Sequence, residues 1–140
     1  MDNANFPGYA AYHASTNSTI VNEVDFLTDI ANYFNELLVN PTNIHSLPDL
    51  IKFTQTDPLE DWPDRNVVTW QNAVALNLTQ QSPAYTAALA ADKYLGSNAT
   101  IEGAINMYGL DALIMPTSQA PGIAAIAGYP VVTVPLGYHP

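Results

Sequence analysis

Serine is one residue type in this sequence that can act as a nucleophile in catalysis. Among the serines, Ser118 is the one best placed to meet a ligand. It follows the residues Met-Pro-Thr at the end of the apolar run 112–115. In α/β proteins, ligands bind at the carboxyl ends of the strands. A serine nucleophile also needs a base within hydrogen-bond reach. No Lys or His lies near Ser118 in the sequence, so a base would have to come from a distant segment.

The other serines are better explained by local structure. Ser46 and Ser82 each precede an expected helix, and serine is favoured as a helix N-cap. Ser15, Ser18 and Ser97 lie in expected loops beside or within glycosylation motifs. We therefore assign no serine as catalytic from its position in the sequence.

The histidines do not form a metal-binding pattern. His13, His45 and His139 are scattered and lack the i, i+4 spacing of metal ligands on a helix. The absence of cysteine excludes thiolate sites and a cysteine nucleophile. Gly122 and Gly128 are spaced wrongly for a nucleotide-binding loop. We expect neither a metal ion nor an organic cofactor.

Three motifs for asparagine-linked glycosylation begin at Asn17, Asn77 and Asn98. The composition predicts about two such motifs by chance, so three is a small excess. Lysine is scarce, whereas asparagine and threonine are abundant, which favours a secreted protein. We expect an extracellular location, although no signal peptide opens the chain.

The charge of the chain excludes one class of partner. Thirteen acidic and three basic residues give a formal net charge of −10. Such a negative surface repels the phosphates of nucleic acids. It repels anionic membrane surfaces in the same way, because like charges repel. The apolar runs are also much shorter than the roughly 18 residues of a membrane span. We expect no nucleic acid partner and no membrane span.

Helical patterns occupy most of the sequence, from about residue 23 to residue 109. The first predicted helix has Asp25 as its N-cap and stops at Asn40-Pro41. In the predicted helix 82–96, Pro83 takes the first position and Gly96 the left-handed position after the helix. Residues 1–22 show no sustained period and are interpreted as irregular. The other predicted helices lie within 46–58, 67–78 and 100–109.

The pattern changes in the last part of the chain, from about residue 110 to residue 137. The runs 112–115 and 131–134 are short, apolar and bounded by proline, which is typical of strands buried on both faces. The 15 residues between them suit a parallel crossover through a short helix. The predicted fold class is therefore α/β, with helices followed by a β-α-β unit. Because two strands cannot form a covered sheet alone, we expect the chain to be a fragment of a larger sheet.

Two stretches of the sequence carry a family resemblance. The segments "GLDALIMPT" and "AAIAGYPVVTVPLGY" resemble the amidase signature family of serine hydrolases, and its fungal, secreted branch in particular. The resemblance covers roughly residues 3–140. It implies a mixed sheet flanked by helices and hydrolysis of C–N amide bonds by a Ser–cis-Ser–Lys triad, without a metal or organic cofactor.

The catalytic part of that family pattern has no counterpart in this sequence. There is no adjacent pair of serines, and neither Lys52 nor Lys93 matches the base of the family. The resemblance therefore identifies a C-terminal-half segment of an amidase domain, spanning 1–140, and assigns no catalytic residue. It implies that Thr117, Ser118 and Gln119 line the substrate pocket. A plain turn between a strand and a helix is the alternative for these residues.

Two functional hypotheses follow. In the first, the chain is part of an amidase, inactive alone, which meets a small amide substrate only in the full-length context. In the second, it is a non-catalytic remnant that acts as a binding or regulatory partner. Either hypothesis allows association with the missing half or with a full amidase.

Overall fold

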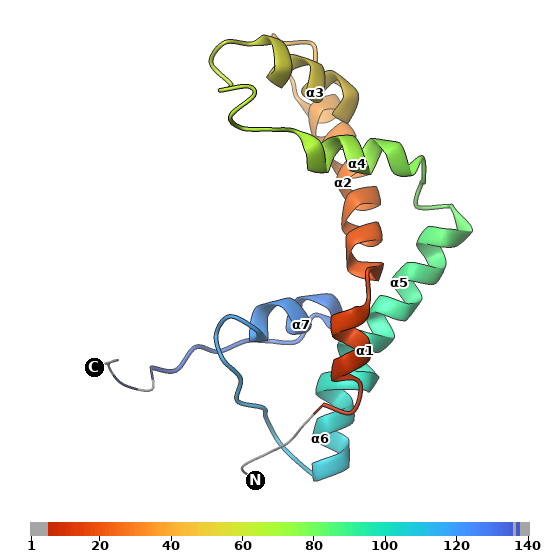
Figure 1. Cartoon of the computed structure of the whole chain (residues 1–140), viewed down its shortest axis with the longest axis vertical. Helices are drawn as coiled ribbons and strands as arrows, with labels where there is room; N and C mark the ends of the chain where they lie inside the picture. The colour runs from red at the N-terminus through yellow and green to blue at the C-terminus, as the bar shows by residue number, and fades with distance from the viewer. Residues whose placement is uncertain (1–5, 136, 138–140) are drawn as a thin grey trace. The chain divides into compact units, whose positions relative to one another are not determined.

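The computed structural model describes residues 6–135 and 137 and divides the chain into two compact units. One unit is Asn17–Ala88, here called the central unit. The other, here called the terminal unit, joins the described residues up to Thr16 to those from Leu89 onward. Figure 1 shows the helices of both units.

Three helices make up most of the central unit. They are α2 (Asn17–Glu36), α3 (Leu47–Thr56) and α4 (Val68–Leu76), and each contacts the other two. The rings of Phe26 and Trp70 stack at 6.4 Å between α2 and α4. The buried side chains of this unit are Val21, Val24, Ile44, Leu47, Thr54, Val67, Ala73, Tyr85 and Ala88.

Local signals at the start of α3 work as the sequence predicts. The hydroxyl of Ser46 accepts a hydrogen bond from the backbone N–H of Asp49 at 3.3 Å and donates one to the Asp49 carboxylate at 2.7 Å. The N-terminal N–H groups of a helix lack partners within the helix, so this cap stabilises the first turn. The helix ends at Thr56, with Asp57 as its C-cap.

The predicted start of α2 is wrong. The helix begins at Asn17, and Asp25 lies within it rather than before it. The Asp25 carboxylate accepts hydrogen bonds from the Gln80 amide and the Tyr85 hydroxyl, both at 2.8 Å. Asp25 therefore connects α2 to the segment around the start of α5 instead of capping a helix.

A long helical segment forms the axis of the terminal unit. Helix α5 (Pro83–Gly96) begins in the central unit and continues without a break into a π-helical turn, η1 (Ser97–Ile101), and then into α6 (Glu102–Tyr108). The buried Thr100 hydroxyl donates to the Leu95 carbonyl oxygen at 2.7 Å, five residues earlier. The helix α6 then ends at Gly109, which has the left-handed conformation expected of a C-terminal glycine.

Gly96 is the last residue of α5, but it lacks the left-handed conformation that the sequence predicts. Its φ of −74° is right-handed helical, and the chain continues directly into η1. A β-carbon on Gly96 would lie 2.6 Å from Cγ2 of Ile126 in α7 (Ala120–Ala127). Glycine is therefore required here by close packing between helices and not by a left-handed backbone.

A short helix, α1 (Tyr9–Ala14), also packs on η1, in a region that the sequence pattern predicts to be irregular. The N–H of Gly8 donates a hydrogen bond to the Ala99 carbonyl. A β-carbon on Gly8 would overlap Ala99. Both α1 and α7 thus contact the π-helical turn (Figure 1).

The predicted β-α-β unit is wrong. Residues 112–115 and 131–134 are not strands, and no β-strand occurs among residues 6–135 and 137. A strand needs a neighbour to satisfy its backbone N–H and C=O groups, and the described chain offers these segments none. Ile114 is 92% exposed and Val132 83% exposed, so they are not buried on both faces. The expected short helix between the two runs does form, as α7. The α/β class and the mixed sheet are therefore replaced by a helical fold.

Candidate functional site

The structure brings Thr117, Ser118 and Gln119 together in one exposed turn before α7. The Pro116 carbonyl oxygen accepts hydrogen bonds from the N–H of Gln119 at 2.9 Å and of Ala120 at 3.2 Å. Because the backbone alone closes the turn, the three side chains are available to a ligand. Within the described part of the chain, no hydrogen bond reaches any of them. The turn follows an extended segment without a strand partner, so Ser118 does not lie at the end of a strand.

A small apolar cluster holds the helix that follows this turn. Ile123 and Ala124 of α7 are buried with Ile101 of η1. Seven partly buried side chains pack against these three. They come from α1 and the segment before it, from α6, and from the segments before and after α7: Phe6, Tyr9, Tyr12, Ile105, Leu113, Met115 and Tyr129. Residues on both sides of the turn, Met115 before it and helix α7 after it, therefore pack into this apolar cluster.

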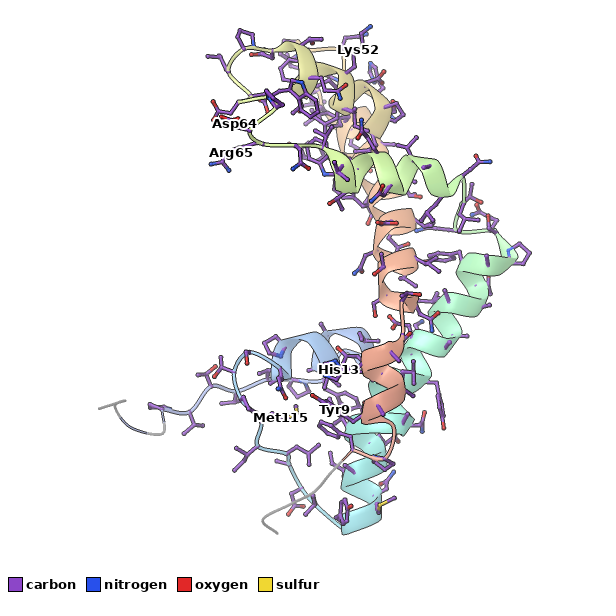
Figure 2. All side chains as sticks on the ribbon, in the orientation of Figure 1. Tyr9, His13, Lys52, Asp64, Arg65 and Met115 are labelled. Carbon is purple, nitrogen blue, oxygen red and sulfur yellow. The ribbon has the colours of Figure 1, made fainter. Side chains whose placement is uncertain are left out.

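Tyr9 and His13 form a polar pair on α1 that sequence reasoning missed. The His13 Nε2 lies 2.7 Å from the Tyr9 hydroxyl, and the two rings meet edge to face at 4.5 Å. Figure 2 shows Tyr9, His13 and Met115 close together where α1 meets α7. An imidazole and a phenol in direct contact can exchange a proton. The i, i+4 spacing of Tyr9 and His13 was the available signal, but it has meaning only on a helix, and the segment is predicted to be irregular.

Burial shifts the acidity of two other tyrosines of this cluster. Burial, the charge of Asp92 and the neighbouring Tyr9 raise the pKa of Tyr12 above its usual value. Burial and the charge of Glu102 raise the pKa of Tyr129. Both phenols therefore remain neutral hydrogen-bond donors to a higher pH than an ordinary tyrosine.

The sequence His45-Ser46 with Asp49 contains the residue types of a catalytic triad, but the contacts differ from those of a triad. The Ser46 hydroxyl bonds to Asp49, not to an imidazole. The two ring nitrogens of His45 lie 2.9 Å from the Asn35 side-chain oxygen and 3.2 Å from that of Asn43. The hydrogen bond from Ser46, followed by the one from the His45 backbone N–H, lowers the pKa of Asp49. This arrangement stabilises the start of α3 and does not activate the serine.

The remaining serine and lysine positions do not supply a nucleophile with a base. Ser82 immediately precedes α5, and its carbonyl oxygen accepts the Thr86 N–H at 3.1 Å. Its hydroxyl accepts the N–H of Thr79 at 2.9 Å, in the turn before the helix. Lys52 lies exposed on α3 (Figure 2), and Lys93 is exposed on α5. In the described structure, neither lysine side chain is hydrogen-bonded to a serine.

The three glycosylation candidates lie in three different local structures. Asn17 is the first residue of α2, Asn77 is the C-cap of α4, and Asn98 lies in η1. Asn77 and Asn98 are exposed, whereas Asn17 is half-buried. They do not converge on a common site.

Neither a metal-binding cluster nor a membrane-spanning helix occurs in the described part of the chain. Among the described residues, no group of three or more histidine, aspartate or glutamate side chains could hold a metal ion. His139 lies outside the described residues. None of the helices that the structure describes combines the length and the apolar character needed to cross a bilayer.

Comparison with known proteins adds one relative. The chain is 32% identical, over all of its 140 residues, to a protein named "Putative amidase" from Arthroderma benhamiae. The chain spans about a quarter (24%) of the length of that protein. No protein-family profile and no solved structure matches the chain. The similarity to the Arthroderma benhamiae protein supports a relationship to the amidase family.

Proposed function

We propose that this chain is one part of an amidase-type serine hydrolase that cleaves C–N amide bonds, and that it supplies no catalytic residue itself. The observation that carries this proposal is the similarity of the whole chain to one quarter of an amidase-like protein. The contacts of two of its serines agree with it, because the Ser46 hydroxyl bonds to Asp49 and the Ser82 hydroxyl to the N–H of Thr79, and neither bonds to a base. The segments "GLDALIMPT" and "AAIAGYPVVTVPLGY" support the finer assignment to the amidase signature group.

Within this proposal, the turn Thr117–Gln119 contributes one side of the substrate pocket. Two hydroxyl groups and one carboxamide project from a turn that backbone hydrogen bonds close. Binding sites require such groups to be held in place by a rigid support. The buried Ile123 and Ala124 provide that support from the helix that follows. We propose that these side chains contact the acyl part of a small amide substrate in the complete enzyme.

The test of the non-catalytic role uses the purified chain. We expect it to hydrolyse neither simple amides nor esters, and a serine-directed fluorophosphonate to leave it unlabelled under native conditions. Two results together would overturn the proposal. One is a serine that is labelled in the folded chain but not after denaturation, and the other is amide turnover that the alanine variant of this serine abolishes.

A second candidate is a binding or regulatory role without catalysis, in which the chain associates with a full amidase. Exposed apolar side chains on the segments beside α7 favour it, namely Ile114, Val132 and Val134. Exposed apolar groups of this size are candidates for an interaction surface. We expect Ile114→Asp combined with Val132→Asp to abolish co-elution of the chain with such an amidase in gel filtration. Unchanged co-elution, or no co-elution of the unaltered chain, would contradict this role.

We also propose that the protein is secreted, from its scarcity of lysine and its excess of asparagine and threonine. Recovery of the mature protein from the culture medium of its native host supports this location. Recovery from the cytosol alone would contradict it.

A further inference from the structure

The three glycosylation motifs differ in the exposure and the hydrogen bonds of the two residues that the transfer reaction needs. Transfer requires the Asn side-chain nitrogen, and it requires the hydroxyl two residues later. In the motif at Asn98, the hydroxyl belongs to Thr100, which is completely buried and donates to the Leu95 carbonyl at 2.7 Å. The Asn98 nitrogen itself donates to the Glu102 carboxylate at 3.1 Å. Both groups are therefore engaged in the π-helical turn.

The surroundings of Asn98 make its motif still less accessible. Ala99, the middle residue, is buried and its carbonyl oxygen accepts the N–H of Gly8. The turn η1 is also the segment on which α1 and α7 pack. Once this part of the chain folds, a transferase can reach the Asn98 motif only by unfolding the core of the terminal unit.

The motif at Asn17 lies in a regular helix. Asn17 is the first residue of α2 and is half-buried. Ser18 and Thr19 belong to the same 20-residue helix. A helical backbone holds the residues of the motif in a fixed conformation, so modification there requires that the start of α2 unwinds.

The motif at Asn77 differs from the other two because both of its reacting residues are exposed and lie outside a regular helix. Asn77 is the C-cap of α4, exposed, with the left-handed backbone angles φ 50° and ψ 41° that asparagine tolerates well. Its backbone N–H bonds to the Val74 carbonyl at 3.2 Å. Within the described chain no hydrogen bond holds its side chain. Thr79, which carries the hydroxyl, is exposed in the turn between α4 and α5. Its hydroxyl accepts the N–H of Gln81 at 3.3 Å and lies 3.4 Å from the Ser82 hydroxyl, but both contacts are at the surface, unlike the buried contact of Thr100.

We propose that Asn77 is the site at which this protein carries an asparagine-linked oligosaccharide, in preference to Asn17 and Asn98. The donor is an oligosaccharide joined to a lipid through a diphosphate. The Asn77 nitrogen forms a bond to the first carbon of the sugar, the bond from that carbon to the phosphate oxygen breaks, and the lipid diphosphate leaves. The nitrogen loses one proton. The inference rests on the proposed secretion and does not depend on the amidase role.

The sequence provides a direct experiment, because its three basic residues separate the three motifs. Trypsin cleaves after Lys52, Arg65 and Lys93, so the motifs fall in the peptides 1–52, 66–93 and 94–140. The full chain is secreted from a eukaryotic host behind a cleaved leader and treated with peptide-N-glycosidase in heavy-oxygen water. The enzyme converts each glycan-bearing asparagine to a heavy-oxygen-labelled aspartate. A sample without the enzyme corrects for spontaneous deamidation.

We expect the label mainly in peptide 66–93, with lower occupancy in the two other peptides. Thr79→Ala leaves Asn77 in place and should abolish the label, whereas Thr79→Ser retains the hydroxyl and should preserve it. Thr100→Ser serves as the matched control and should leave the label of 66–93 unchanged. An unlabelled peptide 66–93 in the secreted chain would overturn the inference, as would occupancy of 1–52 or of 94–140 equal to or above that of 66–93.

Discussion

The carbonyl oxygen of Asn98 occupies the space that a β-carbon on Gly103 would need. In an α-helix two residues five positions apart would not meet in this way, and the contact arises because η1 widens the helix to a π-helical turn. The π-helical turn η1 therefore requires glycine at position 103. Both α1 and α7 pack on this turn.

Replacing this glycine should destabilise the protein. The Gly103→Ala methyl group would overlap a backbone oxygen, which cannot rotate away as a side chain could. We expect a loss of about 1–3 kcal/mol from overpacking, despite the gain of about 1 kcal/mol in helix propensity. The measurement is the free energy of unfolding in urea, followed by circular dichroism.

Gly122→Ala is the matched control for Gly103→Ala. A β-carbon on Gly122, in the first turn of α7, would lie 3.4 Å from the Tyr12 hydroxyl, which is ordinary contact. We expect this variant to be neutral or to gain up to about 1 kcal/mol. Equal destabilisation by the two substitutions would contradict the steric requirement at position 103.

Two buried threonines should respond in opposite directions to the same substitution. Thr100 donates its hydroxyl to the Leu95 carbonyl, whereas the buried Thr54 hydroxyl has no hydrogen-bond partner in the described structure. Thr100→Val should cost about 1–3 kcal/mol, because it removes a buried hydrogen bond. Thr54→Val should be neutral or stabilising, because valine has the same shape without an unsatisfied polar group. Urea unfolding of both variants tests this contrast, and a larger loss from Thr54→Val would contradict it.

The hydrogen bond from Tyr85 to Asp25 should make the stability of the protein fall at alkaline pH. That bond is the main cause of the raised pKa of Tyr85, followed by burial and the charges of Asp25 and Asp29. A raised pKa in the folded state contributes stability below the ordinary tyrosine value of about 10. That contribution is lost as the pH rises from there through the raised value.

This effect can be measured by titrating the tyrosine absorbance of the folded protein. We expect Tyr85→Phe to remove a component that ionises later than free tyrosine. Asp25→Asn should shift that component toward the ordinary value, because the amide carries no charge and is a weaker acceptor. Unfolding measured at several alkaline pH values should show a smaller decline for Tyr85→Phe than for the unaltered protein. Tyr12 and Tyr129 also ionise late, so a late component of the same size in Tyr85→Phe as in the unaltered protein would refute the assignment to Tyr85.

Where helix ends were predicted correctly, the signal was local. The Ser46 and Asp49 cap, Pro83 at the start of α5, and Gly109 at the end of α6 each act within a few residues of the sequence. Such interactions depend only on neighbouring backbone groups. The sequence therefore contains enough information to place these boundaries.

The errors have non-local causes. Asp25 was expected to cap a helix, but its carboxylate bonds to side chains 55 and 60 residues away. Gly96 was expected to end a helix, but it is required by the approach of Ile126 from α7. Neither contact can be inferred from local pattern.

The apolar runs 112–115 and 131–134 were misinterpreted for a related reason. A short apolar run bounded by proline looks the same whether or not a partner strand exists. In the described structure, Leu113 and Met115 pack on the helical cluster while Ile114 is exposed. The turn Thr117–Gln119 was located correctly from the sequence, but its pocket role remains a proposal.

The most direct test of the proposed role replaces the matching quarter of the Arthroderma benhamiae protein with this chain. We expect the chimera to hydrolyse small amides if the intact relative does. Alanines at Thr117, Ser118 and Gln119 should then lower kcat/KM by about tenfold or more, equivalent to about 1.4 kcal/mol, without lowering the melting temperature. Thr69→Ala with Gln71→Ala, both exposed on α4, is the control and should leave kcat/KM unchanged. An intact relative without amidase activity, an inactive chimera of an active relative, or turn variants with unchanged kcat/KM would contradict the proposed role.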